Sequence, residues 1–360
     1  MVSRVAEKRH ATSPARLTAV VYVAVASEPR DLEVVRAGLE RWLRTREPDA
    51  VIGALSVPDA GLSSETCFAP VRSAAGTREL VVRLPPAGAG LFPEYRLDVQ
   101  VAVQEAVADL GVRAVRAEWI DDPTWLGGPF MVMPRVEGNP VARSWALKGW
   151  IVEADVGVRR SVFLNLVDEL ARLHQCTIAH EVSPPEPLSV TVDRWVEYFE
   201  WASGDREPPA FMREACDWCV AEQPQPHGIT AILWGDVQVT NAIFGPDGSV
   251  RALLDWEMAG HGVPELDLGW YVALHEMTLA QVGSVPEGVP RRTEIVDRYV
   301  ETRGREIDAL RWYEAFALFR SGSIMVRMAR LLADQGVDDG WLLTHNPTVA
   351  AFDQVIARRE

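Results

Sequence analysis

Cysteine is scarce in this chain: 4 of its 360 residues are cysteine. So few cysteines exclude a small scaffold that disulfides hold together. Cys216 and Cys219 have the spacing seen in redox and zinc sites, but no second pair lies nearby and the surrounding sequence has a helical pattern. We therefore expect these two residues to pack in a core rather than to bind a metal.

Positive charge is also in short supply. Lysine and arginine total 36 residues against 51 aspartate and glutamate residues, which gives a net charge of −15. A chain this acidic would repel the phosphates of a nucleic acid, so we expect no nucleic-acid partner. The charge fits a cationic substrate without requiring one.

Long apolar runs are missing as well. No stretch approaches the roughly 20 apolar residues that a membrane-spanning helix needs, so we expect no membrane partner. One short apolar run, residues 17–26, follows several basic residues and ends in small ones, as a secretory signal does. Because this run is short, we expect residues 1–28 to form a disordered tail instead.

What the sequence does contain is a change of pattern along its length. In the first third, strands are expected at 51–57, 67–72, 79–84, 112–120 and 130–134, and helices at 31–46 and 95–110. Beyond residue 158, helices are expected at 164–174, 192–201 and 312–332, and short strands at 232–234, 242–244 and 250–254. The segment 135–138 is a natural joint. The chain is predicted to be α+β, with an N-terminal lobe over 29–134 and a C-terminal lobe over 135–360.

Three oxygen-bearing side chains lie at the ends of predicted strands. Asp236 and Asn241 are five residues apart in Trp-Gly-Asp-Val-Gln-Val-Thr-Asn, and Asp255 follows the apolar run Ala-Leu-Leu. One carboxylate in such a set can receive the proton of an acceptor hydroxyl, while the amide and the second carboxylate hold Mg²⁺ on ATP phosphates. The spacing therefore predicts phosphoryl transfer, with Asp236 as the catalytic base and Asn241 and Asp255 as metal ligands. A turn rich in Asp and Asn that merely joins two strands is the alternative.

Several motifs together resemble the aminoglycoside phosphotransferase family, a branch of the protein-kinase-like fold. The His-Gly-Asp-x-x-x-x-Asn pattern of that family is matched by residues 234–241, its metal-binding Asp by Asp255, and its later Pro-x-x-Asp-Leu pattern by residues 264–268. The resemblance covers about residues 50–330. It implies a bilobal α+β fold with a small antiparallel sheet in the N-terminal lobe, ATP and Mg²⁺ as cofactors, a small hydroxyl-bearing substrate and a cytoplasmic location.

The resemblance is weaker in the N-terminal lobe. Gly61, Ser63 and Ser64 lie between two predicted strands, where a loop covering the ATP phosphates belongs, although a plain hairpin turn has the same pattern. The resemblance places Arg83 at the position of a phosphate-binding lysine, with Gln100 in place of that lysine's acidic partner. Adenine is expected against the backbone of Met131, Val132 and Met133.

Three departures from the family pattern leave the activity open. Trp234 replaces a histidine that is generally a scaffold residue, Arg83 replaces lysine, and Gln100 would reduce an ion pair to a neutral hydrogen bond. The first hypothesis is a kinase of an aminoglycoside-like antibiotic, which would confer antibiotic resistance. The second is a kinase of a hydroxyacyl-CoA or another metabolite. The third is a catalytically weak, nucleotide-binding pseudokinase.

The acceptor leaves no motif of its own. Acidic residues are frequent over 193–222 and would attract an amine-rich antibiotic, although solvated helix faces are often acidic. Trp195, Tyr198, Trp201 and Trp218 in the same stretch either stack on a substrate or pack in the core. A basic pocket would favour a CoA ester and an acidic pocket an aminoglycoside. A monomer and a homodimer are both compatible with the sequence.

Overall fold

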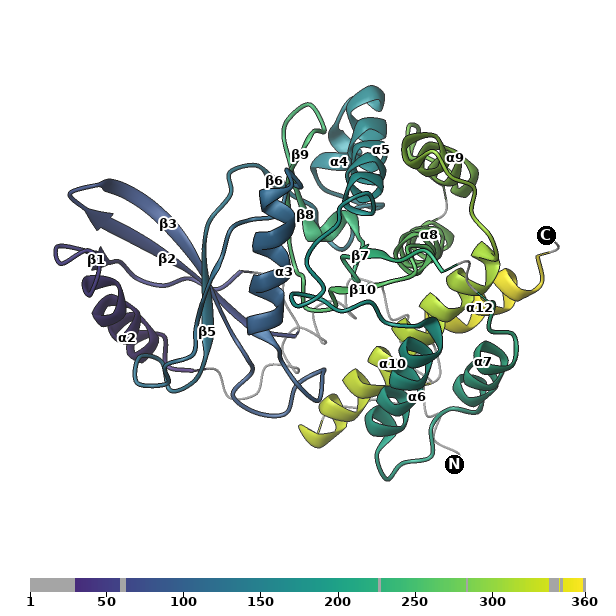
Figure 1. Ribbon diagram of the computed structural model, residues 1–360, viewed down its shortest axis with the longest axis horizontal. Coiled ribbons are helices and arrows are strands. Elements are labelled where there is room, and N and C mark those ends of the chain that lie inside the picture. Colours follow the sequence, from purple (N-terminus) through teal and green to yellow (C-terminus); the bar gives the residue numbers. More distant parts are fainter. Residues whose placement is uncertain are drawn as a thin grey trace, which may run out of the picture.

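The computed structural model describes residues 30–58, 63–225, 228–282, 284–336, 343 and 346–358. The predicted tail and Gly61 therefore lie outside the described residues. Figure 1 shows a sheet-containing lobe beside a larger, mainly helical one. The predicted α+β fold, with a small sheet lobe and a larger helical lobe, is thereby confirmed, whereas the division into lobes between residues 134 and 135 stays a prediction.

The small lobe is built on an antiparallel sheet of order β1-β2-β3-β5-β4. Its strands are β1 (Val51–Ile52), β2 (Glu65–Ser73), β3 (Gly76–Leu84), β4 (Glu118–Ile120) and β5 (Phe130–Pro134). Helix α2 (Leu32–Arg44) begins where the side chain of Asp31 accepts a hydrogen bond from the backbone of Glu33. Its buried Trp42 meets Phe130 of β5 edge to face, with ring centroids 5.7 Å apart. The expected strand over 51–57 is only two residues long.

Helix α3 (Leu97–Asp109) and the segment after it lie against the large lobe (Figure 1). The prediction of one strand over 112–120 was wrong for its first part. The backbone N–H of Leu253 donates to the carbonyl of Arg113 at 2.7 Å, and the N–H of Arg113 donates to Glu169 at 2.9 Å. Both backbone groups of Arg113 thus bond to the large lobe, and the chain joins the small-lobe sheet only at Glu118.

The large lobe packs long helices around short strands. Its helices are α4 (Trp150–Glu153), α5 (Val156–Leu173), α6 (Leu188–Ser203), α7 (Ala210–Ala221), α8 (Glu265–Ala280), α9 (Arg292–Arg303), α10 (Leu310–Asp334) and α12 (Pro347–Ile356). Its strands are β6 (Asn139–Pro140), β7 (Ala231–Leu233), β8 (Ala242–Phe244), β9 (Val250–Leu253) and β10 (Gly260–Gly262). The predicted helices and strands of this region are confirmed, and the helices extend beyond the predicted bounds.

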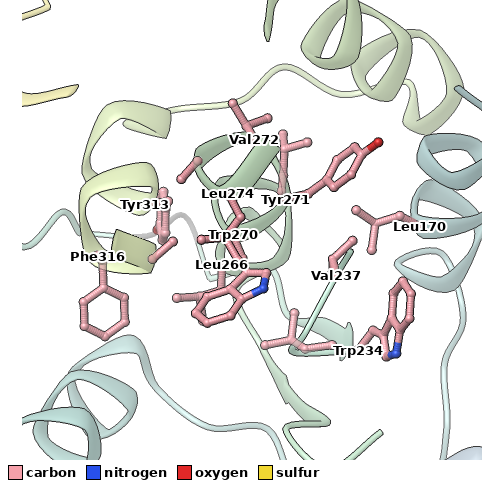
Figure 2. Packing of buried hydrophobic residues seen from close by; sticks show 14 of the residues in the cluster. Leu170, Trp234, Val237, Leu266, Trp270, Tyr271, Val272, Leu274, Tyr313 and Phe316 are labelled. Atoms are coloured by element: carbon pink, nitrogen blue, oxygen red, sulfur yellow. The ribbon is translucent and has the colours of Figure 1, made fainter. Parts of the chain in front are cut away.

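One core joins the helices to the strands that carry the site. Figure 2 shows Trp234 and Val237 beside Leu170 of α5, and Trp270 and Leu266 of α8 facing Tyr313 and Phe316 of α10. Cys216 and Cys219 are buried free thiols within α7, as expected of core residues. Burial raises the pKa of the Cys216 thiol to about 11. Within the described ranges, no helix is both long enough and apolar enough to cross a bilayer.

A small-lobe loop also docks on the large lobe. The Tyr198 hydroxyl of α6 donates to the carbonyl of Leu91 at 2.8 Å, and Arg327 Nε of α10 donates to the carbonyl of Gly90 at 2.9 Å. The Tyr95 hydroxyl accepts a hydrogen bond from the Leu91 backbone at 2.9 Å, which closes this loop on itself. The loop between β3 and α3 is thereby fixed beside the site described next.

Candidate active site

The loop after β7 is held in place by a buried carboxylate. Asp267 is fully buried near the start of α8 and accepts hydrogen bonds from the backbone N–H groups of Trp234 at 2.7 Å and Gly235 at 2.9 Å. His174, at the end of α5, contacts the same carboxylate at 3.2 Å. Gly235 has φ +90°, and a Cβ there would lie 2.0 Å from the carbonyl oxygen of Met258. The turn that presents Asp236 therefore requires glycine and is fixed by helix α8.

Trp234 has a structural role. Its side chain is fully buried, and its indole Nε1 donates to the carbonyl of Leu254 at 2.7 Å. Leu254 immediately precedes Asp255, so this hydrogen bond connects the loop that carries Asp236 to the segment that carries Asp255. The expected scaffold role of this position is consistent with these contacts.

The Asp236 carboxylate is surrounded by donors. Its Oδ1 accepts from Gln238 Nε2 at 2.5 Å and from Trp270 Nε1 at 2.8 Å, and its Oδ2 accepts from Asn241 Nδ2 at 2.7 Å. Burial raises the pKa of Asp236, and the nearby Asp255 carboxylate raises it too, while the hydrogen bonds from Gln238 and Asn241 oppose the rise. The result is an oriented carboxylate whose basicity is increased, as a group that accepts a proton requires.

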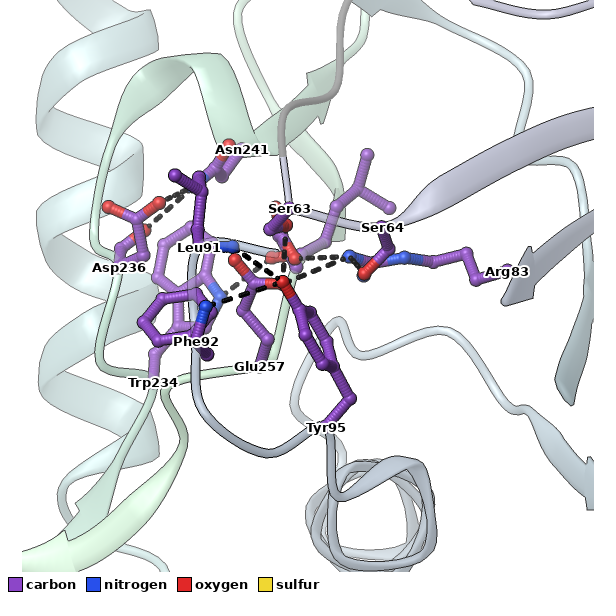
Figure 3. A network of polar contacts seen from close by, with 12 residues as sticks. Ser63, Ser64, Arg83, Leu91, Phe92, Tyr95, Trp234, Asp236, Asn241 and Glu257 are labelled. Atoms are coloured by element: carbon purple, nitrogen blue, oxygen red, sulfur yellow. Dashed lines mark hydrogen bonds and ion pairs between the residues drawn. The ribbon is translucent and has the colours of Figure 1, made fainter. Parts of the chain in front are cut away.

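Asn241 and Asp255 lie next to this carboxylate. The amide nitrogen of Asn241 donates to both the carboxylate and the backbone carbonyl of Asp236, so its amide oxygen is the atom left to bind a ligand (Figure 3). The backbone N–H of Leu254 donates to the Asn241 carbonyl at 2.8 Å, which brings Asp255 alongside. Asp255 has φ +59°, an uncommon conformation for a residue other than glycine. The structure thus brings together the three side chains predicted from their spacing.

The donor set fits Mg²⁺ shared with a nucleotide. Within the described part of the chain, no group of three His, Cys, Asp or Glu side chains could enclose a metal ion by itself. Magnesium is commonly bound by one or two carboxylate or amide oxygens, with substrate phosphates and water completing the octahedron. Asn241 Oδ1 and the Asp255 carboxylate, whose side chain is 29% exposed, match that arrangement.

Arg83 links the two lobes at this point. Its Nη2 lies 2.7 Å from Asp255 Oδ1. It also lies 3.5 Å from Glu257 Oε2 and 3.2 Å from Ser64 Oγ (Figure 3). Ser63 Oγ donates to Glu257 Oε2 at 2.5 Å. Burial, together with the Asp255 carboxylate, raises the pKa of Glu257 to about 8. Ser63, Ser64 and Arg83 therefore converge on the carboxylates of the large lobe.

The expected hydrogen bond between Arg83 and Gln100 is not formed. Gln100 is buried in α3 and its Oε1 has no hydrogen-bond partner among the described residues. Glu105, the nearby acid, instead pairs with Arg116 at 2.9 Å. A carboxylate forms a stronger hydrogen bond with a guanidinium than a neutral amide does. The Arg83 side chain therefore points towards Asp255 rather than towards Gln100.

The strand β5 leaves a free backbone edge just after the predicted adenine contacts. The N–H of Arg135 donates to the carbonyl of Glu79 at 2.9 Å, and the register pairs Met133 with Val81 and Met131 with Arg83. Because hydrogen-bonded pairs alternate along an antiparallel ladder, Met131 and Met133 direct their backbone groups towards β3. Pairing with β4 ends at Val132. The backbone groups of Met131 and Met133, which were expected to contact adenine, therefore face β3 instead. The Pro134 carbonyl and the Val136 N–H lie on the edge that no described strand pairs.

Sequence reasoning missed the groups that orient Asp236. Gln238 lies within the motif itself, but Trp270 and Asp267 are distant in sequence and reach the loop only because α8 packs beside it. The motif Pro-Glu-Leu-Asp-Leu at 264–268 was the available signal for Asp267. Nothing in the local sequence marks Trp270 as a partner of Asp236.

This geometry agrees with a family comparison. A family model described as the phosphotransferase enzyme family matches residues 59–313, which include all three central side chains. The chain belongs to this family. Two curated relatives are acyl-CoA dehydrogenase family member 11 of Mus musculus and of Gallus gallus, which are 25% and 26% identical over 77% and 83% of the chain. The chain spans only 36% and 41% of the length of these relatives.

Solved structures share the fold of this phosphotransferase-family chain at low identity. A Ralstonia eutropha JMP134 protein assigned to the aminoglycoside phosphotransferases has a TM-score of 0.66 at 19% identity, covering 90% of this chain and 98% of that one. Choline kinase LicA of Streptococcus pneumoniae has a TM-score of 0.58 at 13% identity, covering 89% and 98%. A spectinomycin phosphotransferase solved with ADP and spectinomycin has a TM-score of 0.54 at 12% identity, covering 88% and 93%. At these identities the likeness establishes the fold alone.

Proposed function

We propose that this chain transfers the γ-phosphoryl group of ATP to a hydroxyl group of a small molecule. The observation that carries the proposal is the joined set of Asp236, Asn241 and Asp255. Asn241 bonds to Asp236 with its nitrogen and keeps its oxygen for a metal, and Asp255 is held beside it by backbone bonds. A simple turn would not need to leave metal-binding oxygens in this arrangement beside an oriented carboxylate.

The reaction follows from these placements. The acceptor oxygen attacks the γ-phosphorus in line, the bond from that phosphorus to the β–γ bridging oxygen breaks, and ADP leaves. Asp236 orients the hydroxyl and takes its proton. Gln238 and Trp270 hold the carboxylate in that orientation through the hydrogen bonds at 2.5 and 2.8 Å. Mg²⁺, when bound by Asn241 and Asp255, supplies positive charge to the phosphates.

We also propose where the nucleotide binds, from the free edge of β5 and from the contacts of Ser63, Ser64 and Arg83. The adenine would lie against the free edge of β5, where the Pro134 carbonyl accepts from its amino group and the Val136 N–H donates to a ring nitrogen. Ser63, Ser64 and Arg83 lie at the phosphate end, close to Asp255. The chain has lysine only at positions 8 and 148, so Arg83 is the cation available for the phosphates at this position of the small lobe.

A hydroxyacyl-CoA acceptor is the second candidate for the same reaction. It is motivated by curated relatives that carry the name acyl-CoA dehydrogenase family member 11. The departures that motivate the pseudokinase hypothesis have structural counterparts: Trp234 donates to the Leu254 carbonyl, and Arg83 pairs with Asp255 rather than with Gln100.

The test is an ATP-consumption screen of the purified chain with Mg²⁺. The acceptors are aminoglycosides, macrolides, hydroxyacyl-CoAs and short hydroxylated metabolites, and each positive is checked by mass spectrometry for an added phosphate. We expect at least one acceptor to stimulate ATP consumption and to gain a phosphate. Binding of ATP with no transfer to any class of acceptor would favour the pseudokinase reading.

A further inference from the structure

The acidic residues of the segment 193–222 all face solvent. All eight aspartate and glutamate side chains between residues 193 and 222 are exposed: Asp193, Glu197, Glu200, Asp205, Glu207, Glu214, Asp217 and Glu222. In contrast, Trp195 and Tyr198 of α6 are buried and face the lobe interior. The acidic side chains of this segment are therefore solvent-exposed, whereas Trp195 and Tyr198 pack in the core.

A buried arginine lies on the interior side instead. Arg320 belongs to α10 and follows an apolar run, Ala-Phe-Ala-Leu-Phe, and it is 5% exposed. Its guanidinium carbon lies 4.6 Å from the centroid of Trp195 on α6 and 4.6 Å from that of Trp270 on α8. Two indole rings from different helices therefore fix the position of this cation.

Among the residues that the structure describes, the Arg320 guanidinium has no hydrogen-bond acceptor. Its Nε is enclosed without a hydrogen-bond partner. Ring contacts offset part of the cost of burying the charge, but they supply no oxygen to its N–H groups. Burial lowers the pKa of Arg320 to about 10, so the side chain remains charged at neutral pH. A buried cation with unused donors is costly to a fold unless a ligand completes it.

Arg320 is one indole ring away from the proposed catalytic base. Trp270 contacts the Arg320 guanidinium through its ring and donates from Nε1 to Asp236 Oδ1 at 2.8 Å. Arg143, an exposed residue, exerts an electrostatic effect on Asp236, and Arg194 exerts one on Arg320. Two arginines, Arg143 and Arg320, therefore interact electrostatically with Asp236, although the chain as a whole is strongly acidic.

We infer that the acceptor carries an anionic group close to its reacting hydroxyl, and that Arg320 binds this group. This inference rests on the proposed function, because it places the hydroxyl at Asp236. The planar guanidinium matches the two oxygens of a carboxylate or of a phosphate monoester. Because Trp270 contacts both Arg320 and Asp236, the anionic group and the reacting hydroxyl must be close together in the acceptor. Small hydroxy acids and phosphorylated alcohols meet this requirement, and polycationic aminoglycosides do not. Arg320 is a specificity residue in this account, not a catalytic one.

A purely structural role for Arg320 makes a different prediction. The negative charges of Asp267 and Asp236 act on Arg320, so the cation could serve only to balance these carboxylates. In that case replacing it would weaken the fold or the turnover of every acceptor alike. Binding of an anionic acceptor group instead changes the preference between acceptors that differ only in that group.

The experiment measures this preference with matched probes. Two pairs differ only in the anionic group: 3-hydroxybutyrate with 3-hydroxybutyramide, and glycerol 3-phosphate with glycerol. Kanamycin represents a cationic acceptor. 3-Hydroxybutyryl-CoA represents an acceptor whose negative charge is far from its hydroxyl. Wild type, Arg320→Met and Arg320→Lys are compared, with Arg330→Met as a control on the same helix. Lys keeps the charge without the planar fork, so it remains informative if the Met variant fails to fold.

The wild type should prefer the anionic member of at least one pair, and that preference in kcat/KM should fall by roughly 100-fold in Arg320→Met. The loss should appear mainly in KM for the acceptor, and KM for ATP should not change. The pair for which the preference is found shows whether Arg320 binds a carboxylate or a phosphate. Equal use of neutral or cationic acceptors by the wild type, or an unchanged preference in both Arg320 variants, would overturn the inference and leave the phosphotransferase proposal standing.

A wild type that phosphorylates none of these probes counts against the proposed function separately. Binding then decides the role of Arg320: saturation-transfer NMR is recorded with 3-hydroxybutyrate and with glycerol 3-phosphate in the presence of Mg²⁺ and ADP. Binding by the wild type and by Arg330→Met, but not by Arg320→Met, supports the anion site. No binding of either probe to the wild type refutes it.

Discussion

Replacing Asp236 with asparagine is expected to reduce phosphate transfer by a factor of roughly 10³ to 10⁴, the upper range for removal of a general base. Asparagine has nearly the same shape and can still accept from Trp270 or Gln238, but it cannot take a proton from the acceptor. The Asn241 amide would then face a second amide nitrogen, so a small loss of stability is also expected. Steady-state turnover with the best acceptor of the screen measures the first effect, and thermal unfolding measures the second.

Asp247→Asn is the matched control for this substitution. Asp247 lies in the exposed turn between β8 and β9, where it accepts hydrogen bonds from Ser249. The same chemical change there should leave turnover close to that of the wild type. Turnover by Asp236→Asn within a few-fold of the control would show that another group receives the acceptor proton.

Replacing Asp255 with asparagine is expected to remove most of the Mg²⁺ dependence of ATP binding and to reduce turnover by about 10³-fold, because a hard anionic ligand of the ion is lost. Asn adopts the left-handed backbone conformation more readily than most residues, so the φ of +59° should be retained. Alanine at this position would add backbone strain to the loss of the ligand, which makes asparagine the cleaner test. Arg83 would keep its contact with Glu257.

Isothermal titration with ATP, carried out with and without Mg²⁺, measures this effect directly. The wild type should bind ATP more tightly when Mg²⁺ is present, and Asp255→Asn should show little difference between the two conditions. Asp247→Asn again serves as the control, because it makes the same aspartate-to-asparagine change away from the site. An unchanged response to Mg²⁺ in Asp255→Asn would remove Asp255 from the metal site.

The loop that carries Asp236 and Asn241 was predictable from the sequence because its determinants are local. β7, the 3-10 turn η1 (Val239–Asn241), β8 and β9 follow one another within about two dozen residues, so spacing alone sets the relative positions of Asp236, Asn241 and Asp255. The fold class was predictable for a related reason: strand-like runs precede helical ones, and this order is typical of a sheet lobe followed by a helical lobe.

What the sequence did not reveal depends on contacts between distant segments. Arg83 and Asp255 are 172 positions apart, and the choice of Asp255 over Gln100 is made where the two lobes meet. The loss of strand at 112–115 has a similar cause, since Leu253 offers those residues a backbone partner in the large lobe. Arg320 did leave a sequence signal, a single charge within an apolar helical run, but its proximity to Trp270 required the packing of α8 on α10.

We propose that Asp236, Asn241 and Asp255 form one site for a metal-bound nucleotide and a hydroxyl. The decisive measurement is a crystal structure of the chain with Mg²⁺ and a non-hydrolysable ATP analogue. We expect an ion within about 2.0–2.1 Å of Asn241 Oδ1 and of an Asp255 oxygen, bridging to the phosphates, with the terminal phosphate facing Asp236. A nucleotide bound away from these residues, or an ion that contacts neither Asn241 nor Asp255, would refute the proposed site.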